Sequence, residues 1–221
     1  MLPKVVWSIP SQGTFNLHAS LLPNYRGAAP INWVLMNGET QTGMTTFLID
    51  EQIDTGNLLL QTKVDIPYDW TAGNLHDHLM EKGANLVLET VKGLEKGELK
   101  AHVQDESLYI NKAPKIFKEN CQVDWSQPAD KLYHFVRGLS PYPTAWTKLE
   151  GQVLKLFRAN VVELTTQESP GTILNNESAD SITIVCGLNA LEITELQLAG
   201  KKRMSTADFL RGYKGTLNRV D

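Results

Sequence analysis

The stretch Phe15-Asn16-Leu17-His18-Ala19-Ser20-Leu21-Leu22-Pro23-Asn24-Tyr25-Arg26-Gly27 lies close to the amino terminus and changes character halfway along. Residues 14–18 have the composition of a short strand, and alternation along a strand directs Asn16 and His18 to one face. Residues 20–27 form a loop with proline and glycine, and a helical pattern begins near residue 28. A polar pair at the end of a strand, followed by a loop and a helix, is typical of ligand sites in α/β sheets. A strand edge with two hydrogen-bonded polar side chains is the simpler alternative.

The composition is that of a globular protein of one large or two small domains. The chain has 221 residues, of which 42% are hydrophobic and 21% charged. No stretch is long and apolar enough to predict a membrane span or a signal peptide. Cys121 and Cys186 are far apart and lack metal-ligand spacing. Reduced thiols and a cytoplasmic location are therefore expected.

The charges are distributed unevenly. Residues 1–114 have 8 basic and 13 acidic side chains, whereas residues 115–221 have 13 basic and 12 acidic ones. The second half is thus the better candidate for contact with a polyanion, although its balance is far from that of a strongly basic nucleic-acid-binding domain.

The first half alternates strands and helices. Apolar spacing predicts a helix at residues 28–37, and residues rich in threonine and β-branched side chains predict strands at 42–50 and 57–66. Asp54 falls in the polar loop between these strands. A long apolar periodicity then predicts a helix over residues 71–97. The pattern indicates an α/β domain over residues 1–110.

The second half has a different composition. Residues 111–123 have little periodicity and are interpreted as a linker. Ser126 is a candidate N-cap for a helix at 128–138. Short strands are predicted at 145–149, 153–162, 171–174, 181–186 and 191–198, before a helix at 205–211. Five strands of this length with one late helix indicate an OB-like β-barrel over residues 124–221.

The chemistry depends on whether Asp54 returns to face Asn16 and His18. An amide and a protonated imidazole could stabilise an oxyanion that forms on a carbonyl. A carboxylate could orient the imidazole and accept a proton from an attacking amine. This set needs no metal and no protein nucleophile, and it suits transfer of an acyl-like group between two bound substrates. The sequence pattern by itself does not place Asp54 in the pocket.

The motifs together resemble the formyltetrahydrofolate-dependent transformylase family. The first motif is Asn16-x-His18-x-Ser20-Leu21-Leu22-Pro23-x-Tyr25-Arg26-Gly27-Ala28-Ala29-Pro30-Ile31, and the second is Ile53-Asp54-Thr55-Gly56. Within the family the chain is most similar to the members that formylate methionyl-tRNA. That similarity rests on Gln104-Asp105-Glu106, Asp124-Trp125-Ser126, Pro141-x-Pro143-x-Ala145-Trp146, Pro170-Gly171-Thr172-Ile173-Leu174 and Ala199-Gly200-Lys201-Lys202-x-Met204-Ser205.

The resemblance implies transfer of formyl from 10-formyltetrahydrofolate, a co-substrate, to the amino group of initiator methionyl-tRNA. Asn16 and His18 would hold the oxyanion, and Asp54 would pair with His18 and help to deprotonate the amine. The loop Ser20, Leu21, Leu22 and Pro23 would contact the folate. The OB-like domain would hold the tRNA, and the candidate phosphate contacts are Lys112, Lys115, Lys118, Lys201, Lys202 and Arg203. The protein is expected to be a monomer.

The motif begins unusually early in this chain. A complete member of the family has another half of its Rossmann-like folate-binding domain before the Asn-x-His motif. The resemblance therefore implies an N-terminally truncated polypeptide, with the carboxy-terminal part of that domain and an exposed sheet edge. Such a chain is expected to be inactive, or nearly so, by itself.

Two other functions stay open at this level. An amino-sugar formyltransferase shares the Asn, His and Asp residues and has a similar second domain, whereas a purine-precursor transformylase lacks that domain. A non-catalytic OB-type RNA-binding fragment would bind tRNA but not folate. The chain lacks the dense basic and aromatic face of a general single-strand binder, which makes this second alternative less favourable.

Overall fold

The computed structural model describes residues 3–174 and 180–221, and the chain forms two compact units. The first unit contains Met1–Val34, Glu39–Trp70 and Asn74–Lys115, and the second contains Leu35–Gly38, Thr71–Gly73 and Ile116–Asp221. The main division between them falls between Lys115 and Ile116, inside the predicted linker segment.

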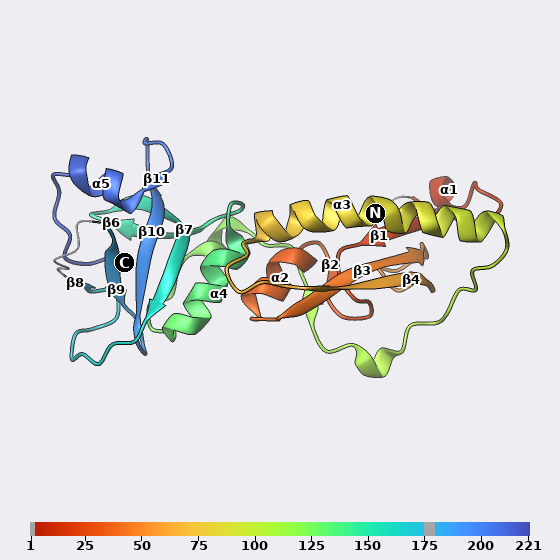
Figure 1. The fold of residues 1–221 in the computed structure, drawn as a ribbon, viewed down its shortest axis with the longest axis horizontal. Coiled ribbons are helices and arrows are strands. Elements are labelled where there is room, and N and C mark those ends of the chain that lie inside the picture. Colours follow the sequence, from red (N-terminus) through yellow and green to blue (C-terminus); the bar gives the residue numbers. More distant parts are fainter. Residues whose placement is uncertain (1–2, 175–179) are drawn as a thin grey trace. The chain divides into compact units, whose positions relative to one another are not determined.

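A three-stranded antiparallel sheet forms the centre of the first unit. Its strands are β1 (Phe15–His18), β3 (Gln41–Leu48) and β4 (Leu58–Asp65), in the order β1-β3-β4. The helix α3 (Ala72–Glu95) lies along one face of this sheet, as Figure 1 shows. Thr46 and Thr90 share a hydrogen bond of 2.9 Å between sheet and helix. The strands and the long helix confirm the α/β pattern expected from the sequence.

Short elements complete the first unit. They are α1 (Lys4–Trp7), β2 (Arg26–Gly27), α2 (Pro30–Met36), the 3₁₀ helix η1 (Glu106–Leu108) and β5 (Lys112–Ala113). The sequence predicts α2 but neither β2 nor β5, which pair in parallel. The Tyr25 N–H also donates to the Asn111 carbonyl at 2.8 Å. The first residues of the predicted linker are thus part of the structure around the Ser20–Gly27 loop.

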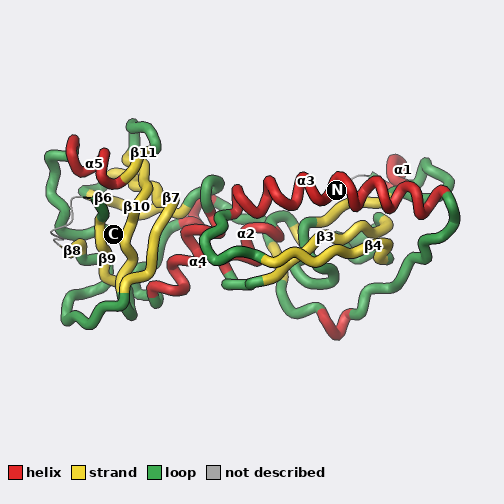
Figure 2. The backbone as a smooth tube through the Cα atoms, in the orientation of Figure 1, coloured by secondary structure: helices red, strands yellow, loops and turns green. Residues whose placement is uncertain are grey.

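The second unit is built on an antiparallel sheet with the order β6-β7-β10-β9-β8, and β11 pairs with β10. Figure 2 distinguishes its strands from its helices. The strands are β6 (Ala145–Leu149), β7 (Gln152–Val162), β8 (Ile173–Leu174), β9 (Ile182–Val185), β10 (Ala190–Leu198) and β11 (Met204–Ser205). The 3₁₀ helix η2 (Lys118–Cys121) and the helices α4 (Ala129–Leu139) and α5 (Thr206–Gly212) accompany them. This β half-barrel agrees with the OB-like prediction.

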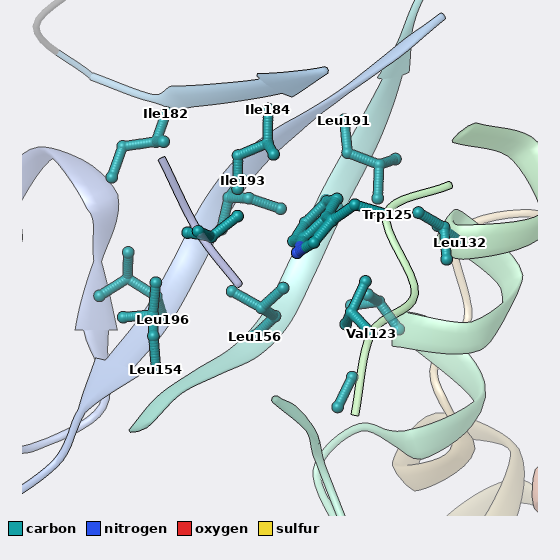
Figure 3. Close-up of a cluster of buried hydrophobic side chains, with 14 of the residues drawn as sticks. Val123, Trp125, Leu132, Leu154, Leu156, Ile182, Ile184, Leu191, Ile193 and Leu196 are labelled. Carbon is teal, nitrogen blue, oxygen red and sulfur yellow. The ribbon is translucent and has the colours of Figure 1, made fainter. Parts of the chain in front are cut away.

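Alternation along the strands produces the core of this unit. Leu154 and Leu156 of β7 are buried, whereas Lys155 between them is exposed. Figure 3 shows Leu156 in the apolar cluster with Trp125, Leu191 and other buried side chains. The Trp125 indole N–H donates to the Thr147 hydroxyl at 3.0 Å, so its polar atom is satisfied inside the core.

The predicted cap of α4 is wrong. The position before the helix is Pro128, and the Ser126 hydroxyl donates instead to the Asp124 carboxylate at 2.6 Å. Ser126 therefore closes a turn three residues before the first residue of the helix, because its short side chain competes well for local hydrogen bonds. Ser205 does cap α5, since its hydroxyl accepts from the Asp208 N–H at 3.1 Å.

Among the helices in the described residues, none is both long enough and apolar enough to cross a membrane.

Candidate active site

Strand β1 places Asn16 and His18 on the same face of the sheet. Asn16 lies opposite Phe47 of β3, and His18 lies opposite Thr45. The side chains at Leu17 and Met44 point to the other face, where they approach Gly83 of α3. Asn16 is exposed, whereas His18 is only 6% exposed. The strand thus presents an accessible amide beside a buried imidazole.

The imidazole of His18 is fixed by a backbone carbonyl. Its Nε2 lies 2.8 Å from the Tyr25 carbonyl oxygen, which can only accept, so Nε2 carries a proton. Tyr25 has a φ of +60°, a left-handed conformation that costs free energy for a residue with a side chain. Nδ1 is the nitrogen left for chemistry, and it lies 3.7 Å from Asp54 Oδ2.

Asp54 stands in the loop between β3 and β4, also in a left-handed conformation with a φ of +56°. Its Oδ2 accepts from the Gly27 N–H at 2.9 Å. Asp50 stabilises the same loop, because its carboxylate accepts from the Gln52 N–H and from the Thr55 hydroxyl. The separation of 3.7 Å from His18 Nδ1 exceeds a hydrogen bond. The pair is therefore close enough for electrostatic attraction without a direct hydrogen bond.

An open cavity of about 540 Å³ lies beside Asp54 and is lined by Asn16, Phe47, Ile49, Asp50, Gln52, Ile53 and Asp54. Asn16 and Asp54 contribute polar groups to its wall. His18 packs edge-on against Phe47, with 6.4 Å between ring centroids. An amide and a carboxylate thus line one space in which a carbonyl group and an amine could meet, and the buried His18 imidazole lies next to two of its lining residues, Phe47 and Asp54.

The predicted folate loop is largely internal. The Ser20 hydroxyl donates to the Asn24 carbonyl at 2.6 Å, and the Thr45 hydroxyl donates to the Ser20 carbonyl at 2.7 Å. The Leu22 N–H donates to the same Thr45 hydroxyl. None of the four residues from Ser20 to Pro23, all of them described, lines the cavity with Asn16 and Asp54. The Ser20 hydroxyl and the backbone of Ser20 and Leu22 instead fix the loop that orients His18, and a folate contact stays a prediction.

Two further residues reach the site from positions that no local pattern singles out. Gln104 is 4% exposed, and its Nε2 donates to the carbonyls of Asp54 and Gly56, each at 2.8 Å. Its Oε1 accepts from Nε of Arg26 at 3.1 Å and from Nη2 at 2.6 Å. The resemblance includes both residues in its motifs, but without a role for either. Only the contacts in the folded chain indicate a role for Arg26 and Gln104, since the two residues are far apart in the sequence.

The predicted phosphate contacts fall in both units. Lys112 and Lys115 belong to the first unit, and Lys118, Lys201, Lys202 and Arg203 belong to the second. All six side chains are exposed. Arg203 forms a two-atom ion pair, because both its Nε and its Nη2 donate to the Glu195 carboxylate at 2.7 Å.

A hollow of about 540 Å³ lies on the second unit. Its lining includes two lysines and no acidic side chain, and consists of Ile116, Lys118, Tyr142, Pro143, Thr144, Trp146, Val153, Lys155, Gln197, Leu198, Ala199 and Gly200. Lys201 follows directly after the last of these residues.

Comparison with known proteins gives two matching family models. Residues 1–91 match the model described as formyl transferase, and residues 115–214 match the formyl transferase C-terminal domain. The chain therefore has the fold of the formyl transferase class.

Relatives of known function identify the family within this class. The methionyl-tRNA formyltransferase of Flavobacterium johnsoniae is 46% identical over 216 residues, which cover 96% of this chain and 68% of the relative. That of Phocaeicola vulgatus is 47% identical, with coverage of 99% and 70%. The chain belongs to the methionyl-tRNA formyltransferase family.

A solved structure supports the fold independently. HypX from Aquifex aeolicus, in complex with tetrahydrofolic acid, superposes with a TM-score of 0.70 and 23% identity. The match covers 98% of this chain and 40% of HypX.

Proposed function

We propose that the protein transfers the formyl group of 10-formyltetrahydrofolate to the amino group of initiator methionyl-tRNA. The observation that supports this most strongly is that Asn16 and Asp54 line one cavity and His18 lies 3.7 Å from Asp54, in a chain of the methionyl-tRNA formyltransferase family. The tetrahydrofolic acid bound by HypX, a structure of similar fold, is consistent with a folate co-substrate.

The reaction begins when the amine nitrogen attacks the formyl carbon. The carbonyl oxygen becomes an oxyanion, and two donors are available to it: the Asn16 side-chain amide and a protonated His18 Nδ1. His18 can donate only from Nδ1, because Nε2 is committed to the Tyr25 carbonyl. Donors that are already oriented stabilise an oxyanion more effectively than water, since they need no reorganisation.

Asp54 completes the proton balance. Its carboxylate accepts the proton that the amine loses as the new C–N bond forms. When the bond between the formyl carbon and folate N10 breaks, that proton passes to N10. The Gly27 N–H keeps one oxygen of Asp54 in place during these steps.

Lys112, Lys115, Lys118, Lys201, Lys202 and Arg203 are proposed to contact the tRNA phosphates. The hollow of the second unit supports the proposal, because Lys118 and Lys155 line it without any carboxylate nearby in the lining. Arg203 is expected to contribute least, since Glu195 already neutralises it.

The proposed chemistry is tested by two substitutions in the site. Asn16→Ala removes an oxyanion donor, and kcat is expected to fall by about 10²–10³. Asp54→Asn keeps an acceptor for the Gly27 N–H but removes the base, and kcat is expected to fall by about 10²–10⁴. The assay follows formyl transfer to methionyl-tRNA.

The chain spans 68% of the Flavobacterium johnsoniae relative. The assay therefore uses the chain by itself and a chimera in which it replaces the matching part of that relative. A kcat within threefold of the parent for both variants would exclude these roles for Asn16 and Asp54.

A further inference from the structure

The side-chain amide of Gln104 uses all of its hydrogen-bonding capacity at the candidate site. Both N–H groups donate to carbonyls of the Asp54 loop, and both lone pairs of Oε1 accept from Arg26. The orientation of this amide is unambiguous, because a guanidinium only donates and a backbone carbonyl only accepts. One buried side chain thus connects two segments that differ widely in sequence position.

Arg26 stands between the two backbone groups that orient the proposed catalytic pair. The carbonyl before it, of Tyr25, accepts from His18 Nε2. The N–H after it, of Gly27, donates to Asp54 Oδ2. A displacement of Arg26 would therefore move the partners of both His18 and Asp54.

The Arg26 side chain is itself held on several sides. It is 9% exposed, and its Nη1 and Nη2 donate to the Glu106 carboxylate at 3.1 and 2.6 Å. Its guanidinium lies 4.9 Å from the centre of the Tyr109 ring. Of these three partners of Arg26, Gln104 is the one whose side chain also bonds to the Asp54 loop.

We propose that Gln104 is the positioning residue of the His18–Asp54 pair, because its amide fixes the backbone on both sides of the site. Through Nε2 it holds the loop in which Asp54 adopts its left-handed conformation. Through Oε1 it holds Arg26, and with it the Tyr25 carbonyl and the Gly27 N–H. The inference rests on the proposed function, for which it adds a residue that does not touch the substrates.

Replacing Gln104 by glutamate tests its two sets of hydrogen bonds separately: those that its oxygen accepts from Arg26 and those that its N–H groups donate to the Asp54 loop. The new side chain of a Gln104→Glu variant would still accept from Arg26, but it has no proton for the carbonyls of Asp54 and Gly56. Buried carbonyls that lose their donor destabilise their local conformation. The Asp54 loop is therefore expected to move although the ion pair with Arg26 persists.

The test is NMR spectroscopy of the 221-residue chain with labelled glycine and histidine. The Gly27 amide reports its bond to Asp54, and the His18 ring reports its bond to Tyr25. In Gln104→Glu we expect both signals to shift and hydrogen exchange of the Gly27 amide to accelerate at least tenfold. Gln41→Glu, the same change at an exposed position of the same unit, is expected to leave both unchanged.

A second variant keeps the inference testable if Gln104→Glu does not fold. Arg26→Lys retains the positive charge but loses the two-atom contact with Gln104 Oε1. It is expected to displace the same two signals, to a smaller extent. Signals like those of the parent protein in whichever of these variants folds would overturn the positioning role.

Kinetics provide a readout that a merely stabilising residue would not affect. In the chimera, Gln104→Glu is expected to lower kcat by 10-fold to 100-fold, with the KM of each substrate within threefold of the parent. Unchanged kcat in a folded variant would contradict the positioning role. Absence of formyl transfer in the parent chimera would instead refute the proposed function, and the NMR signals would then decide about Gln104.

Discussion

At the scale of single residues, His18 is held at one nitrogen and available at the other. The carbonyl of Tyr25 fixes Nε2, while Nδ1 faces Asp54 across 3.7 Å. Strand alternation predicts that Asn16 and His18 share a face, and the structure confirms it. The identity of the reactive nitrogen could not be predicted, because it depends on a carbonyl in a left-handed residue of the following loop.

His134, which lies outside the candidate site, is expected to make the stability of the fold depend on pH. Burial, and then the neighbouring Arg137, lower the pKa of His134 in α4 below its ordinary value of 6.5. Nε of Arg137 donates to His134 Nδ1 at 3.0 Å, which requires the neutral imidazole. The unfolded chain therefore takes up this proton at higher pH than the folded chain does. This contribution to stability is present above pH 6.5 and is lost as the pH falls further.

Urea unfolding at pH 7 and pH 5 measures the effect. His134→Gln keeps an acceptor for Arg137 but cannot take up a proton, so its stability is expected to fall less between the two pH values than that of the parent. His76→Gln, at an exposed position of α3, serves as the control. An equal loss in the parent and in His134→Gln would contradict the account.

At the scale of elements, the site is assembled by segments that only the folded chain brings together. The sequence predicts β1, β3, β4 and α3, because their periodicities are local properties. It does not predict the pairing of β2 with β5, each of which has two residues. Such short pairs lack any periodicity, and their stability comes from contacts such as those of Arg26 and Gln104 rather than from propensity.

Gly56, in the Asp54 loop, is expected to tolerate no side chain. A Cβ at Gly56 would lie 1.6 Å from the Leu48 carbonyl oxygen, so Gly56→Ala must displace the loop from β3. We expect a loss of about 1–3 kcal/mol in the free energy of unfolding, together with a lower kcat. Urea unfolding and the formyl transfer assay measure the two effects.

The control is Gly212→Ala at the end of α5, where an added Cβ meets no atom within 4 Å. Its stability is expected to remain close to that of the parent. If Gly56→Ala left both the free energy of unfolding and kcat unchanged, the close approach of the loop to β3 would not be needed for stability or for activity.

At the scale of the whole molecule, each unit contributes a different part of the proposed function. The first unit holds the candidate catalytic residues, and the second has a hollow lined by lysines. Composition predicts this division of charge only weakly, since residues 115–221 have 13 basic and 12 acidic side chains. The local arrangement matters more than the total, because Glu195 neutralises Arg203 while no carboxylate lines the hollow.

The lysines of the second unit predict a dependence of tRNA affinity on salt. Lys201→Ala with Lys202→Ala is expected to weaken tRNA binding and to reduce the slope of log affinity against log salt concentration by about 1 for each lost phosphate contact. Lys82→Ala with Lys92→Ala removes the same charge from exposed positions of α3 and is the matched control. An unchanged affinity and slope in the first double variant would remove both lysines from the interface.

The central claim is that this chain supplies the catalytic residues for formylation of methionyl-tRNA. The most direct measurement is formyl transfer from 10-formyltetrahydrofolate to methionyl-tRNA by the chimera with the Flavobacterium johnsoniae relative, with and without Asp54→Asn. We expect transfer by the parent chimera and a kcat lower by about 10²–10⁴ in the variant. A folded parent chimera without transfer, or an Asp54→Asn chimera that transfers as fast as its parent, would contradict it.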